Sequence, residues 1–182
     1  YMRIEEEIKL DYSDVLFRPK RSTLRSRKDV DLNRKYNFKY SKLSWKGTPI
    51  IASNMDGVGE IGIAKKLTSH KVMTALTKQH TIDQISLIYK NSDFHKSVAL
   101  SCGTSNESYN RLNKILQKFP KFQFICIDVA NGYSENFSHF VSNVRKKYPK
   151  KTIIAGNVVT ADMTQELILS GADIVKVGIG PG

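Results

Sequence analysis

Short apolar runs alternate with amphipathic stretches along most of this chain. The apolar runs are rich in β-branched residues and occupy residues 49–55, 72–77, 97–101, 122–129, 152–157 and 173–177. Five stretches with apolar residues at helical spacing lie between them, at residues 61–69, 82–91, 107–119, 134–148 and 161–170. Strands that are apolar on both faces are typical of covered parallel sheets. The pattern therefore predicts an α/β fold of six strands joined by right-handed helical connections.

Local signals support the predicted helix ends. Ser134 and Thr160 stand where helix N-caps are expected, and Gly171 follows the last predicted helix. Behind Ser134, an apolar stripe recurs at helical spacing from Phe137 to Val144. This stripe is interpreted as core.

Two α/β architectures fit this order of elements. An open doubly wound sheet would be complete at 182 residues, whereas a (β/α)8 barrel needs two further βα units. Polar or glycine residues follow every predicted strand, in segments 53–56, 77–80, 101–103, 128–132, 156–157 and 178–182. A barrel builds its site from all the loops at this end, whereas an open sheet concentrates its site at one switch point. The strand ends therefore favour a (β/α)8 TIM barrel.

The barrel interpretation divides the chain into two parts. Residues 1–48 are predicted to form an irregular basic leader packed on the barrel. Residues 49–182 are predicted to supply the first six strands of a single catalytic domain, whose C-terminal part is expected to follow Gly182. Tyr1 precedes Met2, which we interpret as the natural first residue.

The charge of the chain is strongly basic. Lys and Arg number 29 against 17 Asp and Glu, a formal net charge of +12. This excess is compatible with nucleic acid, an anionic membrane or a phosphorylated small molecule as partner. Six basic residues and no acidic one lie between Arg18 and Lys28, without interleaved aromatic residues. Segment 18–28 is therefore interpreted as a solvated or phosphate-binding arm, and no nucleic-acid partner is expected.

Neither a membrane segment nor a secretory signal is evident in the sequence. No run approaches the 18 or so consecutive apolar residues of a membrane helix, and the amino terminus is polar and acidic. The expected compartment is the cytoplasm, with no membrane partner. His70, His95 and His139 show no metal-ligand spacing and are expected at the surface or at helix ends.

The two cysteines show no spacing typical of a zinc site or a disulfide framework. Cys126 lies inside the apolar run 124–127 and is predicted to be a core residue. Cys102 precedes Gly103 at a predicted strand end, where packing in the sheet and catalysis both stay open and packing is favoured. Both thiols are expected to be reduced.

The chain's last predicted strand leads into a glycine-rich loop. Gly178, Gly180 and Gly182 lie within five residues, with Pro181 among them. Such a loop lets main-chain amides and carbonyls approach a ligand or an ion closely. A functional loop is therefore predicted at this strand end.

Several segments together resemble the inosine monophosphate dehydrogenase and guanosine monophosphate reductase family. They are DYSDVLFRPKRSTLRSR (11–27), IIASNMD (50–56), FICIDVANGYSE (124–135), AGNVVT (155–160) and LILSGADIVKVGIGPG (167–182). The dehydrogenases usually carry a regulatory insertion after the second strand, but only about 18 residues separate Lys78 from Ser97. This short connection, and DVANGY in place of the dehydrogenases' Asp-Ser-Ser run, favour the reductase branch.

The resemblance implies an activity. It is NADPH-dependent reductive deamination of guanosine monophosphate (GMP) to inosine monophosphate (IMP) and ammonia, a step of purine salvage, through a covalent cysteine intermediate. The resemblance places the cysteine and a Thr/Glu pair that assists ammonia departure beyond Gly182, so no catalytic residue is assigned within this sequence. It also implies a potassium ion and a homotetramer.

The resemblance further implies binding roles for residues of this chain. Those assigned to the cofactor are Ser26, Arg27, Lys78, Asp128, Val129, Ala130, Ile179 and Gly180. Ser26 and Arg27 match a pair that reaches the adenosine phosphate of NADPH in a neighbouring subunit. Asn54 and Met55 are assigned to the purine, and the carbonyls of Gly180 and Gly182 to potassium.

Two segments depart from the family's usual pattern. Gly57 stands where the family usually has threonine, and the residues around Lys78 read Thr-Lys-Gln-His rather than the common His-Lys-His-Tyr. Two alternatives to the reductase stay open. One is an NAD-dependent oxidoreductase of the inosine monophosphate dehydrogenase type, and the other is a noncatalytic truncated fragment that binds nucleotide.

Overall fold

The structure is a computed structural model that describes residues 6, 8, 10–90 and 93–179. The chain forms two compact units, Tyr1–Asp31 and Leu32–Gly182. The sequence-based division at residue 48 stays a prediction. In the first unit, two short 3-10 helices occur, η1 (Tyr12–Asp14) and η2 (Arg27–Asp29).

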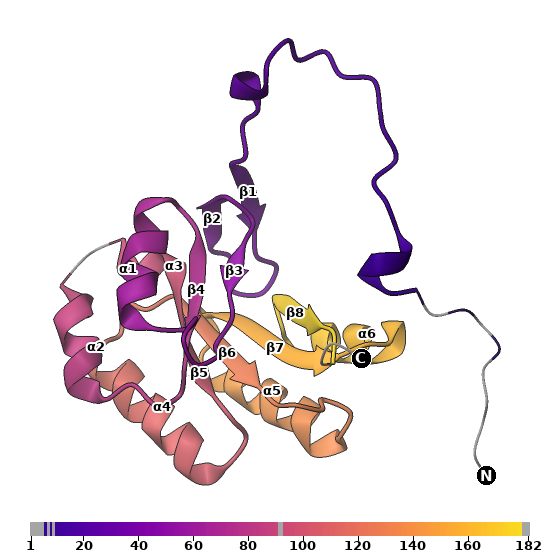
Figure 1. Cartoon of the computed structure of the whole chain (residues 1–182). Helices are drawn as coiled ribbons and strands as arrows, with labels where there is room; N and C mark the ends of the chain where they lie inside the picture. The colour runs from indigo at the N-terminus through magenta and orange to yellow at the C-terminus, as the bar shows by residue number, and fades with distance from the viewer. Residues whose placement is uncertain (1–5, 7, 9, 91–92, 180–182) are drawn as a thin grey trace. The chain divides into compact units, whose positions relative to one another are not determined.

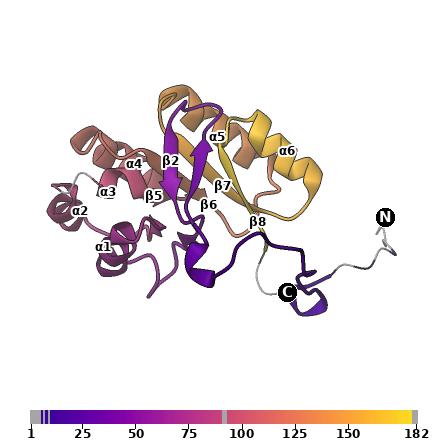
Figure 2. The same ribbon diagram turned by 90° about the horizontal axis from the view of Figure 1, so that it is seen from above.

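A parallel sheet of six strands forms the centre of the second unit (Figure 1). Its strands are β3 (Ile51–Ala52), β4 (Met73–Leu76), β5 (Val98–Cys102), β6 (Phe124–Asp128), β7 (Thr152–Val158) and β8 (Ile174–Val177). They pair in the order of the sequence, without the reversal that a doubly wound sheet requires. The sheet is curled (Figure 2), so the described part of the chain is a partial (β/α) barrel, as the strand ends predicted.

Helices connect the successive strands and lie along the outer face of the curled sheet (Figures 1 and 2). They are α1 (Ile61–Ser69), α2 (Ile82–Tyr89), α3 (Phe94–Ser97), α4 (Asn106–Lys118), α5 (Glu135–Lys147) and α6 (Ala161–Leu169). The five long helices fall within one or two residues of their predicted bounds. Gly171 ends α6 with φ 108°, a left-handed conformation that favours glycine. Ser134 and Thr160 are the N-caps of α5 and α6, as expected, but neither side chain forms a cap hydrogen bond.

The alternation of side chains along the strands creates two apolar clusters on opposite faces of the sheet. The larger cluster packs the sheet against the helices and includes Leu76, Leu100, Ile125, Ile153 and the predicted stripe residue Phe137. The smaller cluster lies on the inner face and includes Met73, Ala75, Ala99, Phe124, Cys126 and Ile154. Burying each large side chain contributes about 1.5–3 kcal/mol.

A β-hairpin occupies part of the segment that was predicted to be irregular. Its strands β1 (Arg34–Asn37) and β2 (Ser44–Gly47) pair antiparallel. The sequence pattern missed it because all four residues of β1 are exposed and only Trp45 of β2 is a buried large apolar residue. Trp45 joins the inner cluster, and its indole N–H donates to Ser97 Oγ at 3.4 Å.

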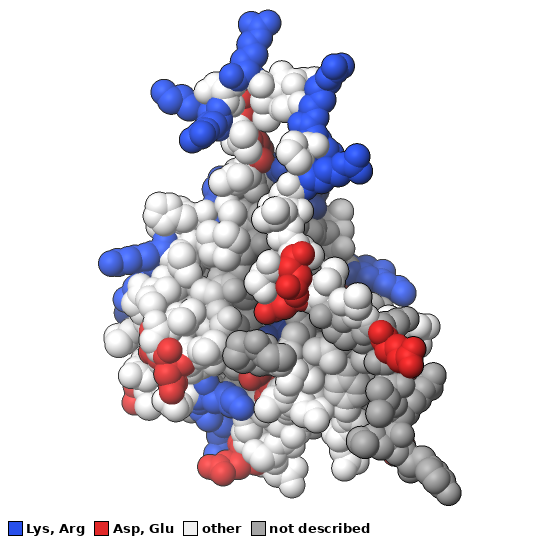
Figure 3. Space-filling model, turned by 45° about the vertical axis from the view of Figure 1, so that its right-hand side comes forward, with Lys and Arg blue, Asp and Glu red and all other residues white. Residues whose placement is uncertain are grey.

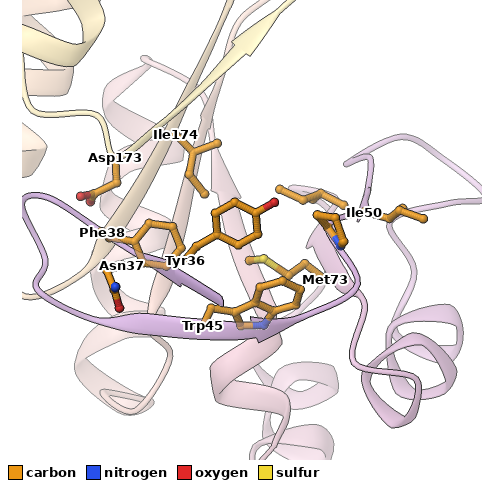
Figure 4. A pocket seen from close by; sticks show the side chains of 10 residues that line it. Tyr36, Asn37, Phe38, Trp45, Ile50, Met73, Asp173 and Ile174 are labelled. Atoms are coloured by element: carbon orange, nitrogen blue, oxygen red, sulfur yellow. The ribbon is translucent and has the colours of Figure 1, made fainter. Parts of the chain in front are cut away.

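The hairpin lies at the amino-terminal end of the sheet. Tyr36, Phe38 and Trp45 border a cavity of about 330 Å³ (Figure 4). The same cavity is lined by Ile51, Met73 and Ile174, which are the first residues of β3, β4 and β8. Most of its wall is apolar or aromatic, and Asn37 and Asp173 are its polar residues.

His95 is a helix-end residue, one of the two positions expected for it, and it is buried. The residue belongs to α3, and only 5% of its surface is exposed. Its ring stacks in a tilted arrangement on Tyr89 and edge-on against Phe122, and Nε2 contacts the Tyr89 carbonyl. The aromatic neighbours come from other elements, so spacing along the chain gave no sign of this packing.

A buried ion pair ties the hairpin turn to the sheet and to α5. The Arg145 guanidinium donates to Asp173 Oδ2 at 2.6 Å, and the Asp173 side chain is fully buried. The same carboxylate accepts from the backbone amides of Tyr40 at 2.8 Å and Ile153 at 3.1 Å. Arg145 also donates through Nε to the carbonyl of Gly171, a residue just after α6, at 2.9 Å. Burial lowers the pKa of the guanidinium, and Asp173 opposes that effect.

We expect Asp173→Asn to lower the free energy of unfolding by about 3–5 kcal/mol, because it leaves the Arg145 charge buried without a countercharge. Guanidinium denaturation followed by circular dichroism measures the change. Asp83→Asn, in the exposed first turn of α2, is the control and should change stability by less than about 1 kcal/mol. Equal effects of the two substitutions would contradict a structural role for the buried pair.

Candidate functional site

Charged and amide side chains meet at the carboxyl ends of the strands. Lys176 on β8 donates through Nζ to Asn54 Oδ1 at 3.2 Å and to Asp128 Oδ1 in an ion pair. Asn54 follows β3, and Asp128 is the last residue of β6. The structure thus brings together one residue predicted for the purine and one predicted for the cofactor.

Lys176 was missed by the sequence reasoning, although a signal for it exists. It stands in the strand Ile174–Val177, whose other residues are all apolar. Charged residues are rarely placed in buried strands unless they are paired or functional. The alternation of the strand puts Lys176 on the same face as Ile174, which packs in the inner cluster.

A cavity of about 200 Å³ lies beside these groups on the inner face of the sheet. Asn54 and Lys176 contribute polar atoms to its wall, and Ala75, Cys126 and Ile154 contribute apolar surface. Met55, predicted to contact the purine, is 64% exposed in the loop after Asn54 and does not line this cavity. The cavity therefore combines apolar residues from the inner face with polar groups that come from the first strand of the sheet order, β3, and from the last, β8.

The loop after β3 explains one departure from the family pattern. Gly57 has φ 75°, and the amides of Val58 and Gly59 donate to the Met55 carbonyl at 3.0 and 2.8 Å. A left-handed residue is strained for threonine, because its β-branched side chain clashes with the backbone there. Glycine at position 57 therefore fits this tight turn.

The loop after β4 carries Lys78 at the surface and a buried histidine. His80 is 7% exposed, and its Nε2 lies 3.1 Å from the Gly59 carbonyl and 3.5 Å from Glu60 Oε2. The Gly59 carbonyl also accepts from the Thr77 amide at 3.0 Å. His80 thus holds the β4 loop against the β3 loop, while Lys78 stays exposed at the same end of the sheet.

Val129 and Ala130 continue directly from the end of β6. Val129 exchanges backbone hydrogen bonds with β7, donating to the Gly156 carbonyl and accepting from the Asn157 amide, both at 2.9 Å. Val129 is half-buried and Ala130 is exposed. The backbone here is fixed by the sheet, so Asp128 is held on a rigid element.

The remaining predicted site residues fall into three groups. Ile179 is half-buried just after β8, following Gly178, whose amide donates to the Val158 carbonyl at 2.7 Å. Gly180 and Gly182, predicted to bind potassium, lie outside the described residues. Ser26 and Arg27 belong to the first unit, where Ser26 caps η2 and accepts from the Lys28 amide at 3.2 Å.

Across residues 10–90 and 93–179, no group of three or more His, Cys, Asp or Glu could hold a metal ion.

Both cysteine side chains are buried in the sheet. Cys126 is a core residue, as predicted, and Cys102 packs in the outer cluster. Burial raises the pKa of Cys102 to about 12 and that of Cys126 to about 11. A thiol is a nucleophile as the thiolate, and neither residue is ionised near neutral pH. Of the two roles left open for Cys102, the structure supports packing.

The charged side chains at the surface are unevenly distributed. Figure 3 shows several Lys and Arg side chains gathered in one region of the face it presents, and basic and acidic side chains interspersed over the rest of that face. Within the described ranges, no helix is long and apolar enough to cross a membrane.

We expect neither Cys102 nor Cys126 to be alkylated by iodoacetamide at pH 8 in the folded protein, because both pKa values lie far above this pH. Both should react fully after unfolding in guanidinium. Peptide mapping by mass spectrometry distinguishes these two sites from any other cysteine. Rapid alkylation of Cys102 in the folded protein would restore it as a candidate nucleophile.

Comparison with known proteins extends these observations. The chain is 54% identical over 183 aligned positions to proteins named GMP reductase from Klebsiella pneumoniae and Escherichia coli. Each alignment covers 100% of this chain and 53% of the relative, so the chain spans about half the length of these relatives. A crystal structure of inosine 5′-monophosphate dehydrogenase from Legionella pneumophila superposes with a TM-score of 0.72 at 28% identity, over 92% of this chain and 50% of that one. The family model for the IMP dehydrogenase / GMP reductase domain matches residues 9–182. The chain therefore belongs to the IMP dehydrogenase / GMP reductase family.

Proposed function

We propose that the full protein carrying this sequence is an NADPH-dependent GMP reductase that converts GMP to IMP and ammonia. The observation that carries the proposal is the 54% identity, across the whole chain, to proteins named GMP reductase. The short connection between β4 and β5 supports the same choice. It runs from residue 77 to residue 97 through α2 and α3, which leaves no room for an inserted regulatory domain.

The proposed reaction is balanced by one hydride and one proton. GMP loses its 2-amino group as ammonia, purine C2 gains a hydride, NADPH is oxidised to NADP⁺, and one proton is taken up. NADPH, when bound, supplies that hydride. The nucleophilic cysteine and the Thr/Glu pair are proposed to lie in sequence beyond Gly182. This chain is therefore proposed to supply binding and orientation.

The residues at the strand ends fit a polar, phosphorylated cofactor and a purine. Lys78 contributes an exposed ammonium, and Asp128 contributes a carboxylate beside the fixed backbone of Val129. Asn54, at the edge of the inner cavity, offers a carboxamide of the kind that pairs with the hydrogen-bonding edge of a purine. These side chains are proposed to orient the two ligands and to hold them away from bulk water.

Three further assignments are proposed from the family resemblance. Ser26 and Arg27 bind the adenosine phosphate of NADPH in a neighbouring subunit, which requires an oligomer, proposed to be a tetramer. The carbonyls of Gly180 and Gly182 help to hold potassium, a cation that oxygen ligands suit. Met55, Val129, Ala130 and Ile179 border the ligands.

We expect the purified full protein to oxidise NADPH in the presence of GMP and to reduce NAD little or not at all in the presence of IMP. Absorbance at 340 nm follows both reactions, and chromatography identifies IMP as product. Turnover with IMP and NAD alone would favour the dehydrogenase alternative.

An intact mass measured on the same preparation tests the fragment alternative. Material with the mass of these 182 residues alone should bind nucleotide without turning over GMP. If such material oxidised NADPH with GMP, the proposed cysteine beyond Gly182 would be wrong.

We expect Arg27→Gln to raise the KM for NADPH by about 10-fold or more, because a charge-assisted hydrogen bond to phosphate is lost. NADH lacks the 2′-phosphate, so its KM should stay unchanged if Arg27 binds that group. Arg25→Gln, two residues away in the same basic segment, is the matched control. Equal effects on the two cofactors would place Arg27 elsewhere than at the 2′-phosphate.

A further inference from the structure

The ion pair between Lys176 and Asp128 joins two strands that do not pair with each other. β7 lies between β6 and β8, and neighbouring strands are about 4.7–4.9 Å apart. The two partners nevertheless share one row across the sheet, since Asp128 pairs with Gly156 and Gly156 pairs with Lys176. The lysine side chain therefore reaches its partner by passing the position of Gly156.

Glycine at position 156 is what leaves this path open. A Cβ built on Gly156 would lie 2.6 Å from both the Cβ and the carbonyl oxygen of Lys176. Such distances are far shorter than ordinary van der Waals contact, so even alanine would force β7 and β8 to shift or would displace the side chain of Lys176. The smallest residue thus occupies the middle of a row whose two ends carry opposite charges.

The ammonium of Lys176 also contacts a residue beside the first strand of the sheet order. Asn54, its second acceptor, follows β3, which is the first strand of the sheet, whereas Lys176 lies on the last. This hydrogen bond of 3.2 Å therefore links the first and the last strand of the sheet order. The side chains of Lys176 and Asp128 are only 28% and 23% exposed, so the contact is shielded from much of the solvent.

We propose that Lys176 is a positioning residue for the reaction, and that Gly156 is the residue that admits it. Its ammonium orients the Asp128 carboxylate and the Asn54 carboxamide, which the proposed function assigns to the cofactor and the purine. A hydrogen-bonded lysine on a strand holds these groups more firmly than loop residues would. The inference rests on the proposed function for its kinetic consequence, and on the register of β6, β7 and β8 for its geometry.

A double-mutant cycle in the full protein tests whether Lys176 acts through Asp128. We expect Lys176→Met to lower kcat/KM for GMP reduction by about 10- to 100-fold in the unsubstituted background. In the Asp128→Asn background, the same substitution should change kcat/KM by only about 3-fold, because the Asp128 carboxylate is already gone and only the Asn54 carboxamide is left for Lys176 to orient. Lys176→Arg, which retains the charge, should recover part of the loss. Independent, multiplicative losses would overturn the proposal.

A second lysine serves as the matched control for stability. Lys151 donates through Nζ to the carbonyls of Pro120 and Phe122, before the start of β7 and away from the site. Lys151→Met should lower the melting temperature while leaving kcat and both KM values within about 2-fold. If Lys151→Met and Lys176→Met reduced kcat/KM equally, a general loss of folding would explain both, and the positioning role would be rejected.

The structure of Gly156→Ala separates this inference from the proposed function. A crystal structure of this variant should show the Lys176 ammonium displaced from Asp128, or β7 and β8 moved apart, and its kcat/KM should fall as in Lys176→Met. An unsubstituted protein that turns over neither substrate pair would refute the proposed function, and with it the kinetic role. An intact Lys176 contact in the Gly156→Ala crystal would refute the role of glycine whatever the activity.

Discussion

The buried pair of Arg145 and Asp173 is the interaction on which the remaining architecture depends. A fully buried carboxylate is costly unless its oxygens are satisfied, and Asp173 receives donors from α5, from β7 and from the turn of the hairpin. The pair therefore fixes the start of β8 relative to three other segments. The register of β7 and β8 is constant from the pair Ile154–Ile174 to the pair Gly156–Lys176, so this anchor at the start of β8 also sets the register at Lys176. Lys176 lies three residues further along the same strand.

The two ends of the sheet have separate physical roles. At the amino-terminal end, the hairpin covers an apolar cavity with aromatic side chains (Figure 4). At the carboxyl-terminal end, each strand leads into a loop with polar or glycine residues, and Lys176 links two of these ends directly. This division is typical of TIM barrels, in which stability residues gather at one end and chemistry at the other. A substitution at Asp173, directly before β8, therefore probes stability, whereas a substitution at Lys176, within β8, probes the candidate site.

Local patterns predicted those parts of the fold that local forces determine. Six apolar runs predicted the six parallel strands, and helical spacing predicted the five long helices, since each buries a continuous apolar face. The hairpin was missed because β1 buries no residue and because the contacts that hold the hairpin, Trp45 to Ser97 and Tyr40 to Asp173, come from segments far along the chain. The burial of His95 was likewise not predicted, because it depends on rings from Tyr89 and Phe122. For the candidate site, the polar strand ends indicated the end of the sheet at which Lys176 contacts Asn54 and Asp128, and both of these partners were named, but their roles stay predictions.

The contacts of Lys176 could not be predicted from local sequence patterns. Its partners lie 122 and 48 residues away in sequence, so neither spacing nor composition connects them. Strand register connects them, because pairing of Asp128 with Gly156 and of Gly156 with Lys176 places a charge at each end of a row with no side chain between. A lone lysine in an apolar strand, one register step from a glycine and two from an aspartate, is therefore a pattern that can be sought wherever parallel strand order is known. The glycine carries as much information as the charged residues, because a side chain at its position would close the path between them.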